Sequence, residues 1–228
     1  MASANIVGYS TKDYKETGFV ATASSFLSVG ENGCYLSQIK PNVTGKCNGT
    51  IQIQLLNGNG VMTKTYKFYQ GGRAPYATDG WYLEKDLITA ENDVLFEAGT
   101  GLWMSGIEGA SFTTSGEVLE GDLVVPLQNG FKMVANPYPT TITLTKIQPI
   151  VTGKCNGAIQ IQLLNKNGVM TKTYKYYQGG RAPYATDGWY EEKTLITEAN
   201  DISFEGGTGL WMSGVTDSSV KFVCPITK

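Results

Sequence analysis

Carboxylates are the side chains of this sequence best suited to catalysis, because the chain contains no histidine. Histidine is the commonest general base and metal ligand, so its absence removes the Ser-His and Cys-His nucleophile pairs. Two carboxylates suffice for glycoside hydrolysis. The sequence does not place any two of these acids near one cleft, and Asp next to Gly is ordinary turn chemistry. We therefore predict that the protein is not an enzyme, although four acidic positions recur in both halves: Asp79/Asp187, Glu84/Glu192, Asp93/Asp201 and Glu97/Glu205.

Metal and phosphate sites are not predicted either. The acidic turn at residues 91–93 and its copy at 200–201 offer oxygen ligands, but their spacing matches no calcium loop. The glycine-rich stretches 71–72 and 99–101 lack the strand, helix and Lys-Ser ending of a P-loop. We expect no metal and no cofactor.

The best binding candidate is a loop that occurs twice without change, at residues 70–82 and 178–190. Glycine and proline fix its backbone, and its Arg, Tyr and Trp are typical of interaction hot spots and sugar-stacking platforms. The alternative, which we favour for the two tryptophans, is that they fill the core. The candidate ligand or interface residues are Arg73, Tyr76, Asp79, Trp81, Arg181, Tyr184, Asp187 and Trp189.

The four cysteines are even in number and lack metal-site spacing. Pairing of Cys34 with Cys47, and of Cys155 with Cys224, would give each half its own disulfide. Alternatively, Cys34 and Cys224 pair between subunits and lock an assembly, or the thiols stay free and buried.

These residues lie in two copies of one unit. Residues 43–106 and 151–214, at an offset of 108, share 54 of 64 positions without a gap. We interpret this identity as a recent tandem duplication with domains at 1–115 and 116–228. The opening parts of the units have diverged, and no flexible linker separates them, so we expect rigid abutment.

The local pattern within each unit predicts strands. Residues 51–55 alternate apolar and polar, residues 57–60 supply a glycine turn, and residues 61–69 are rich in β-branched and aromatic side chains, which together predict a hairpin. Further short strands follow at intervals of about 8 to 12 residues. We predict an all-β fold of two tandem homologous β-sandwich or partly open β-barrel domains.

Charge and hydropathy exclude several partners. The formal net charge is -2 with the basic residues scattered, which disfavours nucleic acid. No apolar run approaches the roughly 18 residues of a membrane span, so we expect no membrane insertion. Residues 2–4 are similar to the small-residue tail that precedes signal cleavage, which favours a mature secreted or cell-surface form.

The second unit opens with Gly130-Phe131 and reaches an Asn-Pro-Tyr-Pro sequence at 136–139, and a glycine-rich bend precedes Trp211. This pattern resembles a repeat of secreted and cell-surface bacterial proteins. The first unit has Ala-Ser-Ser-Phe at 23–26 instead of Asn-Pro-Tyr-Pro. The resemblance implies export and a β fold, and it brings no assigned catalytic residues.

Our leading interpretation is an exported structural or adhesive protein that associates with itself, head to tail, into a filament or surface layer. A contact between unit 1 and unit 2 can recur between chains, and such a heterologous contact stays open. The strand-like segments 5–9 and 220–224 can also add to a neighbour's sheet edge. The alternative is a carbohydrate-binding module or lectin that binds a glycan through the repeated aromatic loop.

Overall fold

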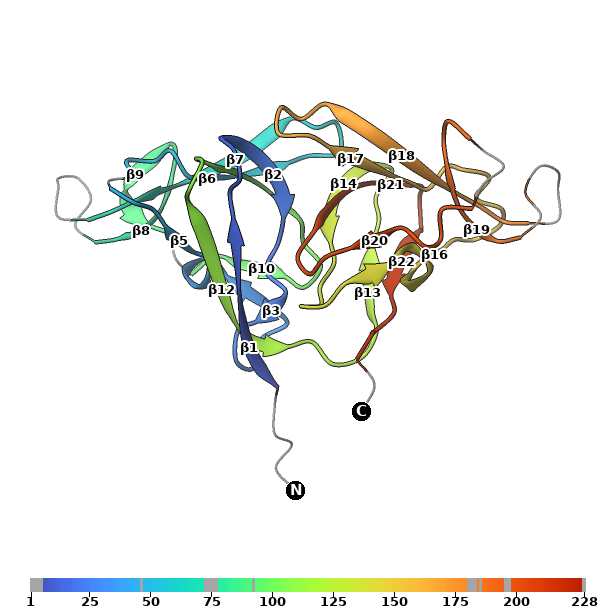
Figure 1. Ribbon diagram of the computed structural model, residues 1–228, viewed down its shortest axis with the longest axis horizontal. Helices are drawn as coiled ribbons and strands as arrows, with labels where there is room; N and C mark the ends of the chain where they lie inside the picture. Colours follow the sequence, from blue (N-terminus) through green and yellow to red (C-terminus); the bar gives the residue numbers. More distant parts are fainter. Residues whose placement is uncertain are drawn as a thin grey trace, which may run out of the picture.

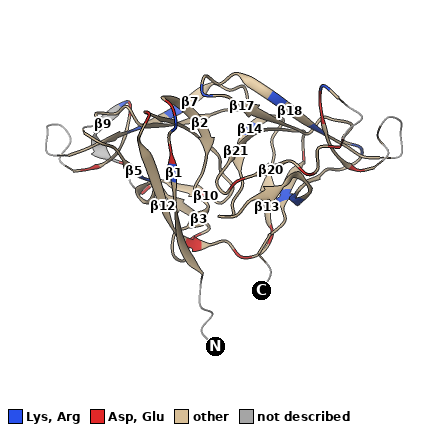
Figure 2. Ribbon diagram, viewed as in Figure 1, with Lys and Arg blue, Asp and Glu red and all other residues tan. Residues whose placement is uncertain are grey.

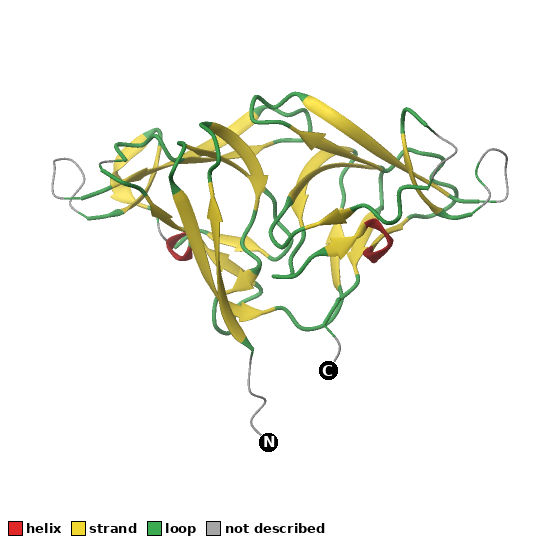
Figure 3. Cartoon of the chain, viewed as in Figure 1, coloured by secondary structure: helices red, strands yellow, loops and turns green. Residues whose placement is uncertain are grey.

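The computed structural model describes residues 6–45, 47–71, 78–91, 93–179, 184, 186–194 and 198–226, with the backbone alone at 86–90. The fold is all-β, with 3% helix and 52% strand in several small antiparallel sheets, which confirms the predicted class (Figure 3). The described residues include no helix that is long and apolar enough to span a membrane.

Unit 1 consists of three antiparallel sheets, with strand orders β1-β12-β3 (β5 also pairing with β12), β10-β4 and β2-β11-β6-β7-β8-β9. Its elements are β1 (Val7–Asp13), β2 (Gly18–Thr22), β3 (Phe26–Leu27), β4 (Gly33–Tyr35), the 3-10 helix η1 (Leu36–Gln38), β5 (Lys40–Asn42), β6 (Gln52–Leu56), β7 (Met62–Tyr69), β8 (Gly80–Leu83), β9 (Asp86–Ala90), β10 (Leu95–Glu97), β11 (Leu102–Gly106) and β12 (Ser111–Val118).

Unit 2 repeats this plan with the orders β13-β22-β16, β14-β21-β17-β18-β19 and β15-β20. Its elements are β13 (Leu123–Pro126), β14 (Gly130–Ala135), β15 (Ile142–Thr143), the 3-10 helix η2 (Leu144–Lys146), β16 (Ile147–Ile150), β17 (Gln160–Leu164), β18 (Met170–Tyr177), β19 (Gly188–Glu191), β20 (Ser203–Phe204), β21 (Gly209–Gly214) and β22 (Ser219–Phe222).

Each sheet of the described residues takes its strands from one unit alone. The last strand of unit 1, β12, runs from Ser111 to Val118, so the expected boundary between 115 and 116 falls inside a strand. The chain passes between the units at residues 119–122, where no strand is formed. β12 therefore continues past residue 115, the predicted end of the first domain.

A separate apolar core lies in each unit. The core of unit 1 takes side chains from both of its larger sheets, such as Phe112 of β12 and Ile53 of β6. The core of unit 2 is built in the same way, with Val220 of β22 and Ile161 of β17. Burial of these apolar side chains is the main force that holds the sheets of each unit together.

The two units lie side by side (Figure 1) and are joined by backbone hydrogen bonds, two of which run from unit 1 to unit 2 and have counterparts from unit 2 to unit 1. Such pairing places the same face of both units in the contact, which is an approximate two-fold relation. The reciprocal backbone bonds are Phe19 N to Lys166 O (3.1 Å) with Phe131 N to Gly58 O (3.0 Å), and Ala23 N to Gly207 O (2.9 Å) with Ala135 N to Gly99 O (2.9 Å).

An apolar cluster around Trp103, Met133 and Trp211 fills this junction. Phe19 stacks on Trp103 with ring centroids 5.4 Å apart, and Phe131 stacks on Trp211 at 5.5 Å. The contact between the units is therefore two-fold, whereas the sequence interpretation expected a head-to-tail contact. Because both faces are already buried within one chain, the same contact is not available between chains.

Candidate functional site

The described base of the repeated loop is closed by its aspartates. Asp79 Oδ1 accepts a hydrogen bond from Gly71 N at 2.6 Å, and Asp187 Oδ1 accepts one from Gly179 N at 2.5 Å. Both carboxylates thus hold the two ends of a loop together. Three predicted ligand residues, Arg73, Tyr76 and Arg181, lie outside the described residues.

The two loop tryptophans are core residues. Trp81 and Trp189 are each 1% exposed. Their indole N–H groups donate to Ile39 O and Ile147 O, both at 2.9 Å, which satisfies the buried donor. Both tryptophans therefore fill the core, as we expected, and neither ring is available to stack on a ligand.

Tyr184, the predicted stacking platform of unit 2, is half-buried in a cluster of three tyrosines. Its ring stacks on Tyr177 with centroids 3.7 Å apart and meets the edge of Tyr190 at 5.0 Å. Burial, followed by hydrogen bonding to Tyr184, raises the pKa of Tyr177 to about 12. One face of Tyr184 is therefore already covered by the protein.

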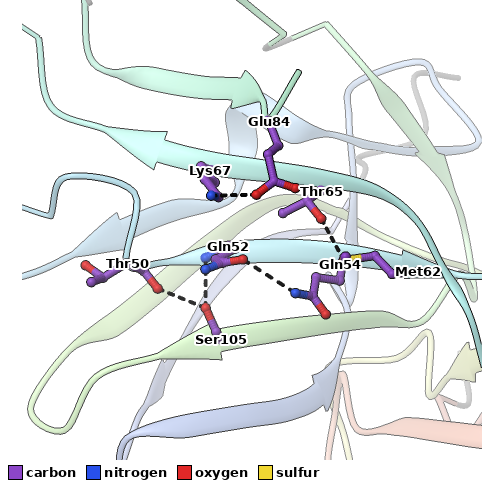
Figure 4. A network of polar contacts seen from close by, with 8 residues as sticks. All are labelled: Thr50, Gln52, Gln54, Met62, Thr65, Lys67, Glu84 and Ser105. Carbon is purple, nitrogen blue, oxygen red and sulfur yellow. Dashed lines mark hydrogen bonds and ion pairs between the residues drawn. The ribbon is translucent and has the colours of Figure 1, made fainter. Parts of the chain in front are cut away.

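The recurring acids do not form a catalytic pair among the described residues. Glu84 forms an ion pair with Lys67 at 2.6 Å, on the strand face that also carries the Ser105 hydroxyl network (Figure 4). Glu192 pairs in the same way with Lys175 at 2.5 Å. Charged residues are dispersed over both units (Figure 2), and the described part of the chain holds no group of three or more acids and cysteines placed to bind a metal.

The predicted disulfides are not found, since all four cysteines are free thiols. Cys34, Cys47 and Cys155 are buried, and Cys224 is partly exposed. Burial raises the pKa of Cys34 and of Cys155, which keeps both thiols protonated and unreactive. A bond from Cys34 to another subunit would require the core of unit 1 to open.

The Asn-Pro-Tyr-Pro segment has a structural role. Asn136 is fully buried, and its side-chain amide donates to Thr140 O at 2.8 Å and to Glu205 O at 3.1 Å. The Tyr138 hydroxyl lies 2.8 Å from Gly121 O and 2.9 Å from Phe222 O. The motif thus fastens to the core of unit 2 both the turn after β20 and the β13-β22-β16 sheet, which we call the outer sheet, as we do its counterpart β1-β12-β3 in unit 1.

The first strand presents an open edge. Among the strands of the described residues, β1 ends its sheet and pairs only with β12; Ile6 O accepts from Val118 N of β12, and Tyr14 N donates to Ala110 O just before that strand. Bonding alternates along an antiparallel strand, so the backbone groups of Val7, Tyr9 and Thr11 point away from β12. Val7 is 69% exposed and Tyr9 is 76% exposed. Of the two strand-like segments expected to add to a neighbour, the second is unsuitable, because β22 lies between β13 and β16.

A second exposed apolar surface lies at the tips of the two long hairpins and was not predicted. Both tips lie over the junction cluster at the top of Figure 1, since Gly60 adjoins Trp211 and Gly168 adjoins Trp103. The sequence signal was an apolar pair directly after an Asn-Gly turn, where polar residues are usual. We define the hairpin-tip patch as the exposed residues Val61, Met62, Val169 and Met170.

Comparisons of the chain with protein-family models, with curated proteins and with solved structures give no match.

Proposed function

We propose that this is an exported structural or adhesive protein whose copies pair through the free edge of β1. The observation that carries the proposal is the pair of exposed side chains, Val7 and Tyr9, on a strand whose outward backbone groups face no other strand of the described residues. An open, apolar strand edge is a template for pairing with another chain. The motif resemblance supports export.

The partner that fits this edge is a second copy of the chain. Antiparallel pairing of β1 with the same strand of a neighbour satisfies the outward N–H and C=O groups on both sides. It also buries Val7 and Tyr9 of both copies. This contact is two-fold and by itself gives a dimer.

The hairpin-tip patch supplies a second contact. It lies on the opposite side of the molecule from the start of β1 (Figure 1). Two self-complementary contacts on opposite sides link copies into an open chain, because each copy uses one contact with each neighbour. The filament of this proposal therefore grows by alternating two-fold contacts.

For each unit we propose the two-sheet sandwich as the finer description of the fold. It is supported by the way each core draws side chains from two facing sheets. Aligned packing of two such sheets is a common solution for burying one face of each.

Light scattering coupled to size exclusion, together with electron microscopy, tests the assembly. Tyr9→Pro removes one outward N–H and leaves the β1–β12 hydrogen bonds intact, so we expect filaments to be reduced to dimers joined at the hairpin tips. Tyr9→Thr keeps the N–H and is the matched control, which retains assembly.

The double variant Met62→Lys, Met170→Lys should instead leave dimers joined at β1, and combining it with Tyr9→Pro should leave monomers. A wild-type protein that stays monomeric at all concentrations contradicts the proposal. So does assembly that is unchanged in the triple variant.

A further inference from the structure

The approximate two-fold relation between the units fails where the first strand of each unit approaches a turn of the other. In one of these two contacts, between β13 of unit 2 and a turn of unit 1, apolar side chains fill the space. A Cβ atom added at Gly99, in the turn of unit 1, would lie 2.8 Å from Val125 Cγ2 and 2.9 Å from Leu123 Cδ2. Two apolar side chains of β13 therefore pack directly on this turn.

In the other contact the same two positions are polar. The repeat offset of 108 relates Thr114 to Phe222 and Phe112 to Val220. The strand register therefore makes Ser10 the counterpart of Leu123 and Lys12 the counterpart of Val125, because the cross-strand pairs are Ser10 with Thr114, Lys12 with Phe112, Leu123 with Phe222 and Val125 with Val220.

The polar contact contains a cavity of about 370 Å³, which we name the β1 cleft. Its lining includes Ser10, Thr11, Lys12 and Ser25 of unit 1 and, from unit 2, Thr141 and Glu205. The facing segments, β1 and the chain around β20, can be followed in Figure 1. Ligand pockets span roughly 300 to 1,000 Å³, so this space suits a small molecule.

The β1 cleft is lined by two side chains of opposite charge, Lys12 and Glu205. Burial lowers the pKa of Lys12, and the negative charge of Glu205 acts in the opposite direction. The ion pairs of the described residues do not include these two side chains. A donor on one wall and an acceptor on the other thus face the same space.

We propose that the β1 cleft binds a neutral mono- or disaccharide, held by Lys12 and Glu205 from opposite walls and by the hydroxyls of Ser10, Ser25 and Thr141. Sugar hydroxyl groups both donate and accept, which matches a site with both kinds of partner. A ligand with a single charge would be repelled by one wall. The proposal is separate from self-association, because the cleft is lined by the second half of β1, at Ser10, Thr11 and Lys12, and does not include the exposed side chains of Val7 and Tyr9.

Saturation-transfer NMR and calorimetry with glucose, galactose, mannose, maltose, cellobiose and lactose test the site. We expect at least one of these sugars to bind in a saturable way. The double variant Ser10→Leu, Lys12→Val copies the apolar residues of β13 and should fill the cleft, which lowers affinity at least tenfold while the protein stays folded.

Glu205→Gln should weaken binding several-fold, and its matched control is Glu97→Gln, the same acid of the other unit, which should leave affinity unchanged. Failure of all six sugars to bind overturns the proposal. Binding that survives Ser10→Leu, Lys12→Val in a folded protein also overturns it, and so does equal loss in Glu97→Gln and Glu205→Gln.

Discussion

The two units share nearly identical hairpins and tryptophan strands, yet they anchor their outer strands differently. In unit 2 the Tyr138 hydroxyl lies within hydrogen-bonding distance of the carbonyl groups of Gly121, just before β13, and of Phe222 in β22. Unit 1 has Phe26 at this place, where the ring packs against Gly8 of β1. The comparison shows that the repeated part sets the fold, and that the diverged opening sets how the outer sheet is held.

A second difference lies in the polar atoms that each unit buries. Tyr14 of unit 1 packs against Gly106, and its counterpart Leu127 packs against Gly214. Among the described residues, the Tyr14 hydroxyl is buried without a hydrogen-bond partner. Unit 1 thus carries an uncompensated polar group, whereas unit 2 uses an apolar side chain in its place.

The largest expected effect is that of Asn136→Ala in unit 2. The change leaves the carbonyl groups of Thr140 and Glu205 without their buried donor, and it removes the acceptor of Tyr138 N. With about 1–3 kcal/mol for each buried group left unpaired, we expect the free energy of unfolding to fall by about 3 kcal/mol. Denaturant unfolding measures this loss.

The matched control is Ser24→Ala, the counterpart in unit 1, whose hydroxyl bonds to the backbone of Phe26 and to the Cys34 thiol, and holds no second turn in place. We expect it to cost about 1 kcal/mol. Equal losses in the two variants would remove the distinction between the units.

Tyr138→Phe should lower the free energy of unfolding by about 1–2 kcal/mol, because it removes the hydroxyl that bonds to the carbonyl groups of Gly121 and of the buried Phe222 at the outer sheet. Hydrogen exchange should also increase in β13 and β22 more than in β17 and β18. Uniform exchange across unit 2 would contradict the assignment of Tyr138 as the anchor of the outer sheet.

Tyr14→Phe should act in the opposite direction and raise the free energy of unfolding by about 1 kcal/mol, because it removes a buried hydroxyl that lacks a partner. Thermal unfolding of the variant beside wild type is the measurement. A loss of stability would show that the hydroxyl has a partner, such as bound water.

The local elements were predictable from the sequence, but the pairing of the units was not. The alternation at 51–55 and the turn at 57–60 predicted the hairpin of β6 and β7, since both signals are local. The two-fold contact joins residues more than a hundred positions apart, such as Phe19 and Lys166, and no local pattern encodes it.

The candidate site was predictable only in part. Trp81 and Trp189 are buried, as we expected from the sequence, because large aromatic side chains beside a strand usually fill a core. The β1 cleft was missed because β1 and β13 share little sequence, so only the strand register shows that Lys12 replaces Val125.

The smallest effect expected concerns the tyrosine cluster of unit 2. Burial, followed by hydrogen bonding to Tyr184, raises the pKa of Tyr177 to about 12 from its ordinary value of 10.0. Because the folded state holds this proton more tightly than the unfolded state, the resulting stability is full below pH 10 and is lost as the pH rises toward 12. Tyr184→Phe removes the hydrogen bond but leaves most of the burial, so the Tyr177 pKa should fall slightly and stay above its ordinary value. Ultraviolet titration of tyrosinate, with Tyr177→Phe used to assign the signal, measures the shift, and a Tyr177 pKa that returns fully to its ordinary value in Tyr184→Phe would show that burial is not its main cause.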